Sequence, residues 1–134
     1  MSRMEVAVAA VKKELNPKQM GAIGLCFGGL CALDLARSGA DLQGVVSIHG
    51  LLNPPNYPSK PRAKILALHG HDDPVVPPDQ VLAFEKEMSE AGADWQVHVY
   101  GGTMHAFTVP TANDPIPKHA RHAIEHFFGN IYQL

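Results

Sequence analysis

Short apolar runs bounded by turn residues recur along the chain and predict four strands. The first run is apolar without alternation, which is typical of a strand buried on both faces of a sheet. The last run alternates apolar and polar residues, the pattern of a strand with two different faces. The predicted strands are residues 20–25, 44–48, 63–68 and 95–100.

Apolar residues at helical spacing separate these strands and predict four helices. The expected helices are 4–15, 28–37, 77–91 and a last one around 124–128. A proline-rich loop at 53–58 contains too much proline for regular structure. Strands that alternate with helices predict an α/β fold with a parallel sheet of about four strands and right-handed crossovers. No repeat or linker divides residues 1–134, so we expect one domain.

Composition and charge narrow the classes of function. The formal net charge is −2 and there is no basic run, which argues against nucleic acid as a partner. No apolar stretch approaches the roughly 20 residues of a membrane span. The first residues lack the apolar core of a signal peptide, so we expect a cytoplasmic protein with no membrane partner.

The chain has two cysteines, Cys26 and Cys31, and both are predicted to be thiols. Residues five apart on a helix have Cα atoms roughly 8 Å apart. A disulfide tolerates at most roughly 7 Å between the two Cα atoms. We therefore interpret Cys31 as a small buried apolar residue and Cys26 as the thiol available for chemistry.

The segment Gly24-Leu25-Cys26-Phe27-Gly28-Gly29 joins a predicted strand to a predicted helix with a thiol at the turn. A nucleophile elbow has this form, because the nucleophile stands on a tight, strained turn. We expect Gly24 and Gly28 to relieve crowding around the turn, and Gly29 to let the helix pack close to the sheet. On these six residues alone, a tight turn around a buried cysteine is the alternative.

Residues capable of acid–base chemistry follow two further strands. The segment 69–74 offers Asp72 and Asp73, of which we favour Asp73 at the tip of a Gly-x-x-Asp-Pro turn. The segment 101–107 offers His105 in a glycine-flanked loop. Carboxyl ends of parallel strands meet at one edge of a sheet. The order thiol, acid, histidine therefore predicts a nucleophile whose base is oriented by a carboxylate.

These segments resemble the dienelactone hydrolase (carboxymethylenebutenolidase) family of the α/β-hydrolase superfamily. The similar stretches are 24–29, 47–51, 68–74 and 100–107, and the resemblance extends over about 15–110. It implies a Cys26, His105 and Asp73 triad that attacks an ester or lactone carbonyl, forms an acyl-enzyme and needs no cofactor or metal. It also implies that the backbone N–H of Phe27 is one oxyanion donor.

The chain departs from the family at two places. It resembles only the C-terminal portion of the family's longer domain, so we expect the N-terminal strands and a second oxyanion donor to be absent and activity to be weak. Where the family has an arginine for a substrate carboxylate, Thr108, Val109 and Pro110 follow the histidine. A less acidic ester or lactone is therefore at least as good a candidate substrate as dienelactone.

Two further expectations concern surfaces. Without N-terminal strands the nucleophile strand is predicted at a sheet edge, where unpaired backbone groups favour pairing with a second copy as a homodimer. The alternative is a fragment stabilised by contacts with other copies. Met104, Phe107 and Tyr57 are candidates for an apolar substrate pocket, although such residues near a site are more often simple packing.

Rival functions rest on other features. The motifs His69-x-His71-x-Asp73 and His119-x-x-His122-x-x-x-His126 have spacings that a metal-dependent hydrolase could use, but no further ligand pattern completes either. A catalytically weak remnant that serves as an interaction module is the other alternative, and the apolar edge strand motivates it.

Overall fold

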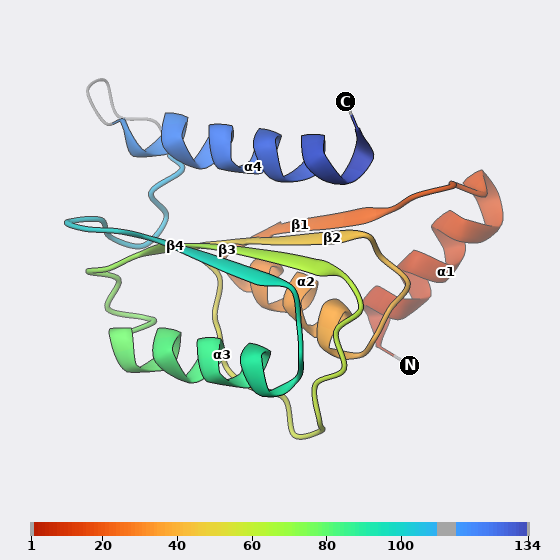
Figure 1. Ribbon diagram of the computed structural model, residues 1–134, viewed down its shortest axis with the longest axis horizontal. Helices are drawn as coiled ribbons and strands as arrows, with labels where there is room; N and C mark the ends of the chain where they lie inside the picture. The colour runs from red at the N-terminus through yellow and green to blue at the C-terminus, as the bar shows by residue number, and fades with distance from the viewer. Residues whose placement is uncertain (1, 110–114, 134) are drawn as a thin grey trace.

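The computed structural model describes residues 2–109 and 115–133 and has the predicted α/β architecture (Figure 1). The four strands form one parallel sheet in the order β1-β2-β3-β4. In chain order the elements are α1 (Arg3–Leu15), β1 (Gly21–Leu25), α2 (Phe27–Arg37), β2 (Gly44–Ile48), β3 (Lys64–Gly70), α3 (Pro78–Glu90), β4 (Trp95–Tyr100) and α4 (Ile116–Tyr132). No helix among the described residues combines the length and the apolar character that crossing a bilayer requires.

The sheet separates two apolar clusters (Figure 1). Helices α2 and α3 pack on one face, against strand residues such as Val45, Ile65 and Ala67. Helix α4 packs on the opposite face, against strand residues such as Val46 and Leu66. Neighbouring strand residues therefore point to different clusters, as the period of two in a strand requires. Burial on both faces holds for β2 throughout.

In the N-terminal part the predicted helix is confirmed, and the strand after it departs from the expected burial. Residues 3–15 are helical, but no residue of α1 is buried, although Val8 packs partly against the core. Strand β1 lies at an edge of the sheet, and one of its faces is open: Ile23 is 51% exposed and Leu25 is 50% exposed. The apolar run that suggested burial on both faces therefore has one uncovered face in this chain.

The charged side chain of Arg37 lies inside the fold, which the sequence did not predict. Arg37, the last residue of α2, donates hydrogen bonds of 2.9 and 2.8 Å to the two carboxylate oxygens of Glu87 on α3. It also bonds to Asp34 and to the carbonyl of Leu52, and its guanidinium carbon lies 5.8 Å from the centroid of the Phe84 ring. This fork ties α2, α3 and the loop after β2 together.

We expect the open edge of β1 to pair with β1 of a second chain, because this would satisfy its backbone N–H and C=O groups and cover Ile23 and Leu25. Light scattering after size-exclusion chromatography is expected to give twice the mass of one chain. Ile23→Lys should shift that mass to one chain. Val99→Lys, on the opposite edge strand β4, is the matched control and should leave it unchanged. A single-chain mass for the wild type would contradict pairing.

Candidate active site

Cys26 lies between β1 and α2 in a backbone conformation that residues other than glycine rarely adopt. Its φ is 52° and its ψ is −123°. The N–H of Cys26 donates to the carbonyl of Ile48 at 3.1 Å, and its own carbonyl accepts from the N–H of Gly29 at 3.0 Å. The residue thus extends the ladder of the sheet and begins the helix. Such strain in a non-glycine residue persists only where the surrounding structure enforces it, as at functional sites.

The turn around Cys26 depends on two of the three predicted glycines. A Cβ at Gly24 would lie 2.0 Å from the carbonyl oxygen of Gly28, and a Cβ at Gly29 would lie 2.8 Å from the Cα of Gly50. A Cβ at Gly28 would meet nothing within 4 Å. The prediction that Gly28 relieves crowding is therefore wrong: its backbone is what crowds Gly24, while its own Cβ position faces open space.

Asp73 and His105 are joined by a short hydrogen bond. His105 Nδ1 lies 2.6 Å from Asp73 Oδ2, and the other carboxylate oxygen accepts from the N–H of Val75 at 2.8 Å. Burial alone would raise the pKa of Asp73, but the hydrogen bonds from His105 and Val75 outweigh it and hold that pKa below its ordinary value. An ionised Asp73 therefore fixes His105 with Nδ1–H toward the carboxylate and Nε2 free for proton transfer.

The two aspartates left open by the sequence occupy different places. Asp72 is exposed, and its N–H donates to the carbonyl of Thr103 at 3.0 Å. Asp73 is buried, with 2% of its surface exposed, and its carboxylate reaches His105. The structure thus brings Asp73 to the histidine, while Asp72 helps to hold the loop that carries it.

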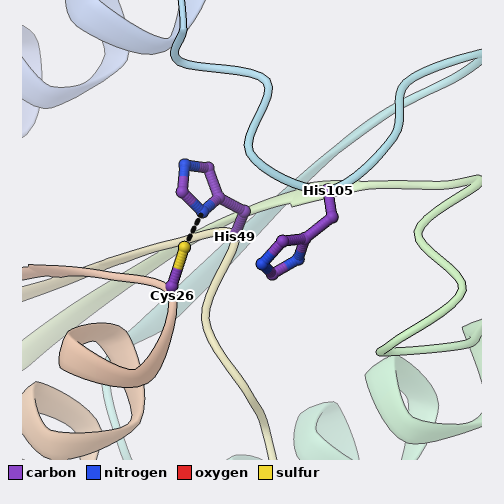
Figure 2. Close-up of side chains that lie close together, drawn as sticks. All are labelled: Cys26, His49 and His105. Carbon is purple, nitrogen blue, oxygen red and sulfur yellow. Dashed lines mark hydrogen bonds between the residues drawn. The ribbon is translucent and has the colours of Figure 1, made fainter.

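A second histidine, His49, lies beside the thiol (Figure 2). Its Nδ1 is 3.3 Å from Cys26 Sγ, and its Nε2 is 2.8 Å from Thr108 Oγ1. Burial, and after it the neighbouring His105 ring, lower the pKa of His49 below its ordinary value, so the ring is neutral near neutral pH. Cys26 Sγ, one ring nitrogen of His49 and one of His105 all lie within 4.8 Å of one another.

The sequence analysis did not assign a role to His49, although the stretch 47–51 was among those that resemble the family. A signal was present: His49 directly follows β2, as Cys26 directly follows β1. The register that pairs Leu25 with Ile48 therefore places the two residues side by side. Thr108, noted in the sequence only because it stands where an arginine was expected, is the residue that anchors His49.

Of the remaining predicted site residues, Phe27, Met104 and Phe107 lie near the site and Tyr57 does not. Phe27 begins α2, where the backbone N–H has no acceptor within the helix, and its side chain is 68% exposed. Met104, His105 and Phe107 line a hollow of about 650 Å³ between the loop after β4 and the start of α4. Burial and the nearby Asp34 carboxylate raise the pKa of Tyr57. Asp34 lies in the second half of α2, away from Cys26 at its start. The structure therefore does not bring Tyr57 to Cys26.

Neither of the two rival metal motifs is among the groups of converging ligands in the described residues. His69 Nε2 donates to the carbonyl of Val76 at 3.0 Å, and His71 is exposed. The three histidines of α4 are also exposed. Within residues 2–109 and 115–133, the potential ligands that converge are Cys26, His49 and His105.

Comparisons with known proteins indicate the family of this chain. A sequence profile of the dienelactone hydrolase family matches residues 1–131. The uncharacterized protein K02A2.1 of Caenorhabditis elegans is 37% identical over 87% of this chain and 77% of its own length. The carboxymethylenebutenolidase homolog of Mus musculus is 20% identical over 85% of this chain and 47% of its own length.

Two solved structures share the fold. A dienelactone hydrolase-like promiscuous phosphotriesterase, P91, from metagenomic libraries is 32% identical, with a TM-score of 0.74 over 83% of this chain and 52% of that one. The esterase Pf2001 of Pyrococcus furiosus is 14% identical, with a TM-score of 0.77 over 95% of this chain and 60% of that one. This chain therefore spans about half the length of the mouse relative and of P91, and rather more of Pf2001.

The glycine contacts generate a paired prediction. Gly24→Ala should distort the elbow, because its Cβ would strike the backbone of Gly28, and it is expected to lower the unfolding free energy by about 2 kcal/mol or more. Gly28→Ala should leave stability unchanged or raise it by up to about 1 kcal/mol, since alanine favours the helix. Urea unfolding followed by circular dichroism measures both. Equal losses for the two variants would contradict the steric account.

Proposed function

Because the chain belongs to the dienelactone hydrolase family, we propose that it hydrolyses carboxylic esters or lactones through a Cys26 nucleophile. In this proposal His105 is the general base and acid, and Asp73 orients it. No cofactor takes part in the steps. The single observation that carries the proposal is the 2.6 Å bond from His105 Nδ1 to Asp73, beside a thiol on a strained turn.

We propose that the described geometry is the resting state of the site. Cys26 Sγ is hydrogen-bonded to His49, and His105 stands within 4.8 Å without a hydrogen bond drawn between them (Figure 2). Catalytic hydrogen bonds often tighten only when substrate binds. We therefore propose that substrate entry turns the sulfur from His49 toward His105 Nε2, which accepts the thiol proton.

The reaction then proceeds in two stages. The Cys26 sulfur forms a bond to the carbonyl carbon, and the carbonyl oxygen gains the electron pair beside the N–H of Phe27. Collapse breaks the bond to the alcohol oxygen, which leaves with the proton held by His105. Water, deprotonated by His105, next attacks the thioester, and release of the carboxylic acid restores the thiol.

The hollow beside His105 bears on the choice of substrate. Among the described residues, its lining includes the apolar Met104, Phe107, Val109 and Ile116 and contains no lysine or arginine. Of the residues that replace the expected arginine, Thr108 is engaged with His49, and Pro110 lies outside the described residues. We therefore propose an uncharged ester or lactone in preference to a substrate with a second carboxylate.

Hydrolysis of p-nitrophenyl acetate tests the proposed roles. Cys26→Ala should reduce turnover to the rate of the uncatalysed reaction. Asp73→Asn should reduce kcat on the order of 10³- to 10⁴-fold, because an amide no longer fixes the tautomer of the histidine. The matched controls are Cys31→Ala and Asp72→Asn, which should retain activity within about two-fold, since Asp72 is exposed and neither residue belongs to the converging group Cys26, His49 and His105.

Equal rates for the wild type and Cys26→Ala would overturn the proposal. They would favour the interaction-module function, which the open face of Ile23 and Leu25 on β1 supports independently.

A further inference from the structure

Three soft or borderline ligand atoms converge at the site in a way that thiol hydrolysis alone does not require. Cys26 Sγ and one nitrogen each from His49 and His105 lie within 4.8 Å of one another. A thiolate and two imidazoles are among the ligand sets that Zn²⁺ prefers. We propose that Cys26, His49 and His105 form a reversible Zn²⁺ site that switches the hydrolase off.

The separations are close to those of a tetrahedral zinc centre. Zinc bonds of about 2.0 Å to nitrogen and 2.3 Å to sulfur place ligand atoms about 3.3 to 3.6 Å apart. The distance from Cys26 Sγ to His49 Nδ1 is 3.3 Å, so this pair is already at that spacing. The third atom, a ring nitrogen of His105, must approach by at most about 1.5 Å to complete the centre.

Both imidazoles are oriented as metal ligands usually are. A ligating histidine commonly donates its second ring N–H to an oxygen, which fixes the tautomer and the plane of the ring. Here Asp73 Oδ2 holds Nδ1 of His105, and Thr108 Oγ1 holds Nε2 of His49. The Nδ1 atom of His49 faces the sulfur, and the His105 ring lies on the side of the thiol as well (Figure 2).

Charge also balances in the loaded site. Binding replaces the thiol proton of Cys26 with a sulfur–zinc bond and releases that proton to solvent. The thiolate and the ionised Asp73 together offset the two positive charges of the metal, and both imidazoles stay neutral. Three protein ligands leave a fourth position for water.

The inhibition rests on the proposed function, because the metal occupies the nucleophile and the base together. Binding itself does not depend on that function, so the two are measured separately. Competition with a chromophoric zinc indicator, in a buffer without phosphate, should give one Zn²⁺ per chain. Cys26→Ala and His105→Ala should each lose this binding, and Thr108→Val should weaken it about 10- to 100-fold through His49.

Matched controls come from the same chain. Cys31→Ala removes the other thiol, and His119→Ala removes an exposed histidine of α4; both should bind Zn²⁺ as the wild type does. Co²⁺ in place of Zn²⁺ should give a sulfur-to-metal charge-transfer band that is absent in Cys26→Ala. Circular dichroism establishes that each variant is folded. Stoichiometric Zn²⁺ binding by folded Cys26→Ala, or loss of Zn²⁺ binding in Cys31→Ala, would contradict the proposed metal site.

Inhibition by Zn²⁺ is measured as the rate of p-nitrophenyl acetate hydrolysis. Zn²⁺ at one equivalent should reduce wild-type hydrolysis at least ten-fold, and EDTA should restore it. Stimulation by Zn²⁺, or full activity with the metal bound, would overturn the switch. Absence of hydrolysis in metal-free protein would overturn the proposed function and the switch with it, while the indicator measurement still decides whether the metal site exists.

Discussion

The parallel register of β1, β2 and β3 is the constraint on which the site depends. Leu25 pairs with Ile48, and Ile48 pairs with Leu68, so Cys26 and His49 leave the sheet at the same level. The ladder continues one step further, because the N–H of His49 donates to the carbonyl of Leu68 at 2.8 Å. A slip of one residue in either pair would send one of these side chains to the opposite face.

The site has two imidazoles with different neighbours and therefore different uses. His105 Nδ1 is bound to the Asp73 carboxylate, which fixes the ring and leaves Nε2 for the proton transfer that we propose. His49 is buried against Phe107, with its ring centroid 5.1 Å from that of Phe107, and burial favours its neutral form. It therefore suits the task of holding the sulfur at rest. The same pair also accounts for the metal affinity that we propose.

Much of this arrangement could be predicted from the sequence because it follows from local patterns. Apolar runs at 44–48 and 63–68 determined their strands, and the glycines around Cys26 marked a turn whose strain the structure contains. The contact between Asp73 and His105 could also be expected. Both residues follow strands of a parallel sheet, and the carboxyl ends of such strands meet at one edge. These features depend on residues close in the chain or on the parallel topology alone.

What the sequence did not reveal depends on contacts between distant residues. The burial of Arg37 requires Glu87, 50 positions later, and its role is invisible in the pattern of α2. The hydrogen bond between His49 and Thr108 likewise spans 59 positions. A Cβ added at Gly28 would point into open space. That direction depends on the folded backbone, and a run of glycines in the sequence does not specify it.

The most direct test of the central claim is the identity of the acylated residue. The protein is mixed briefly with excess p-nitrophenyl acetate, quenched in acid and digested with trypsin. Cys26 and Cys31 fall in one peptide, residues 19–37, so fragment-ion sequencing by mass spectrometry distinguishes them. The account predicts an acetyl group on Cys26 that disappears once the ester is consumed. Turnover without acetyl on Cys26, or equal acetylation of Cys31, would contradict it.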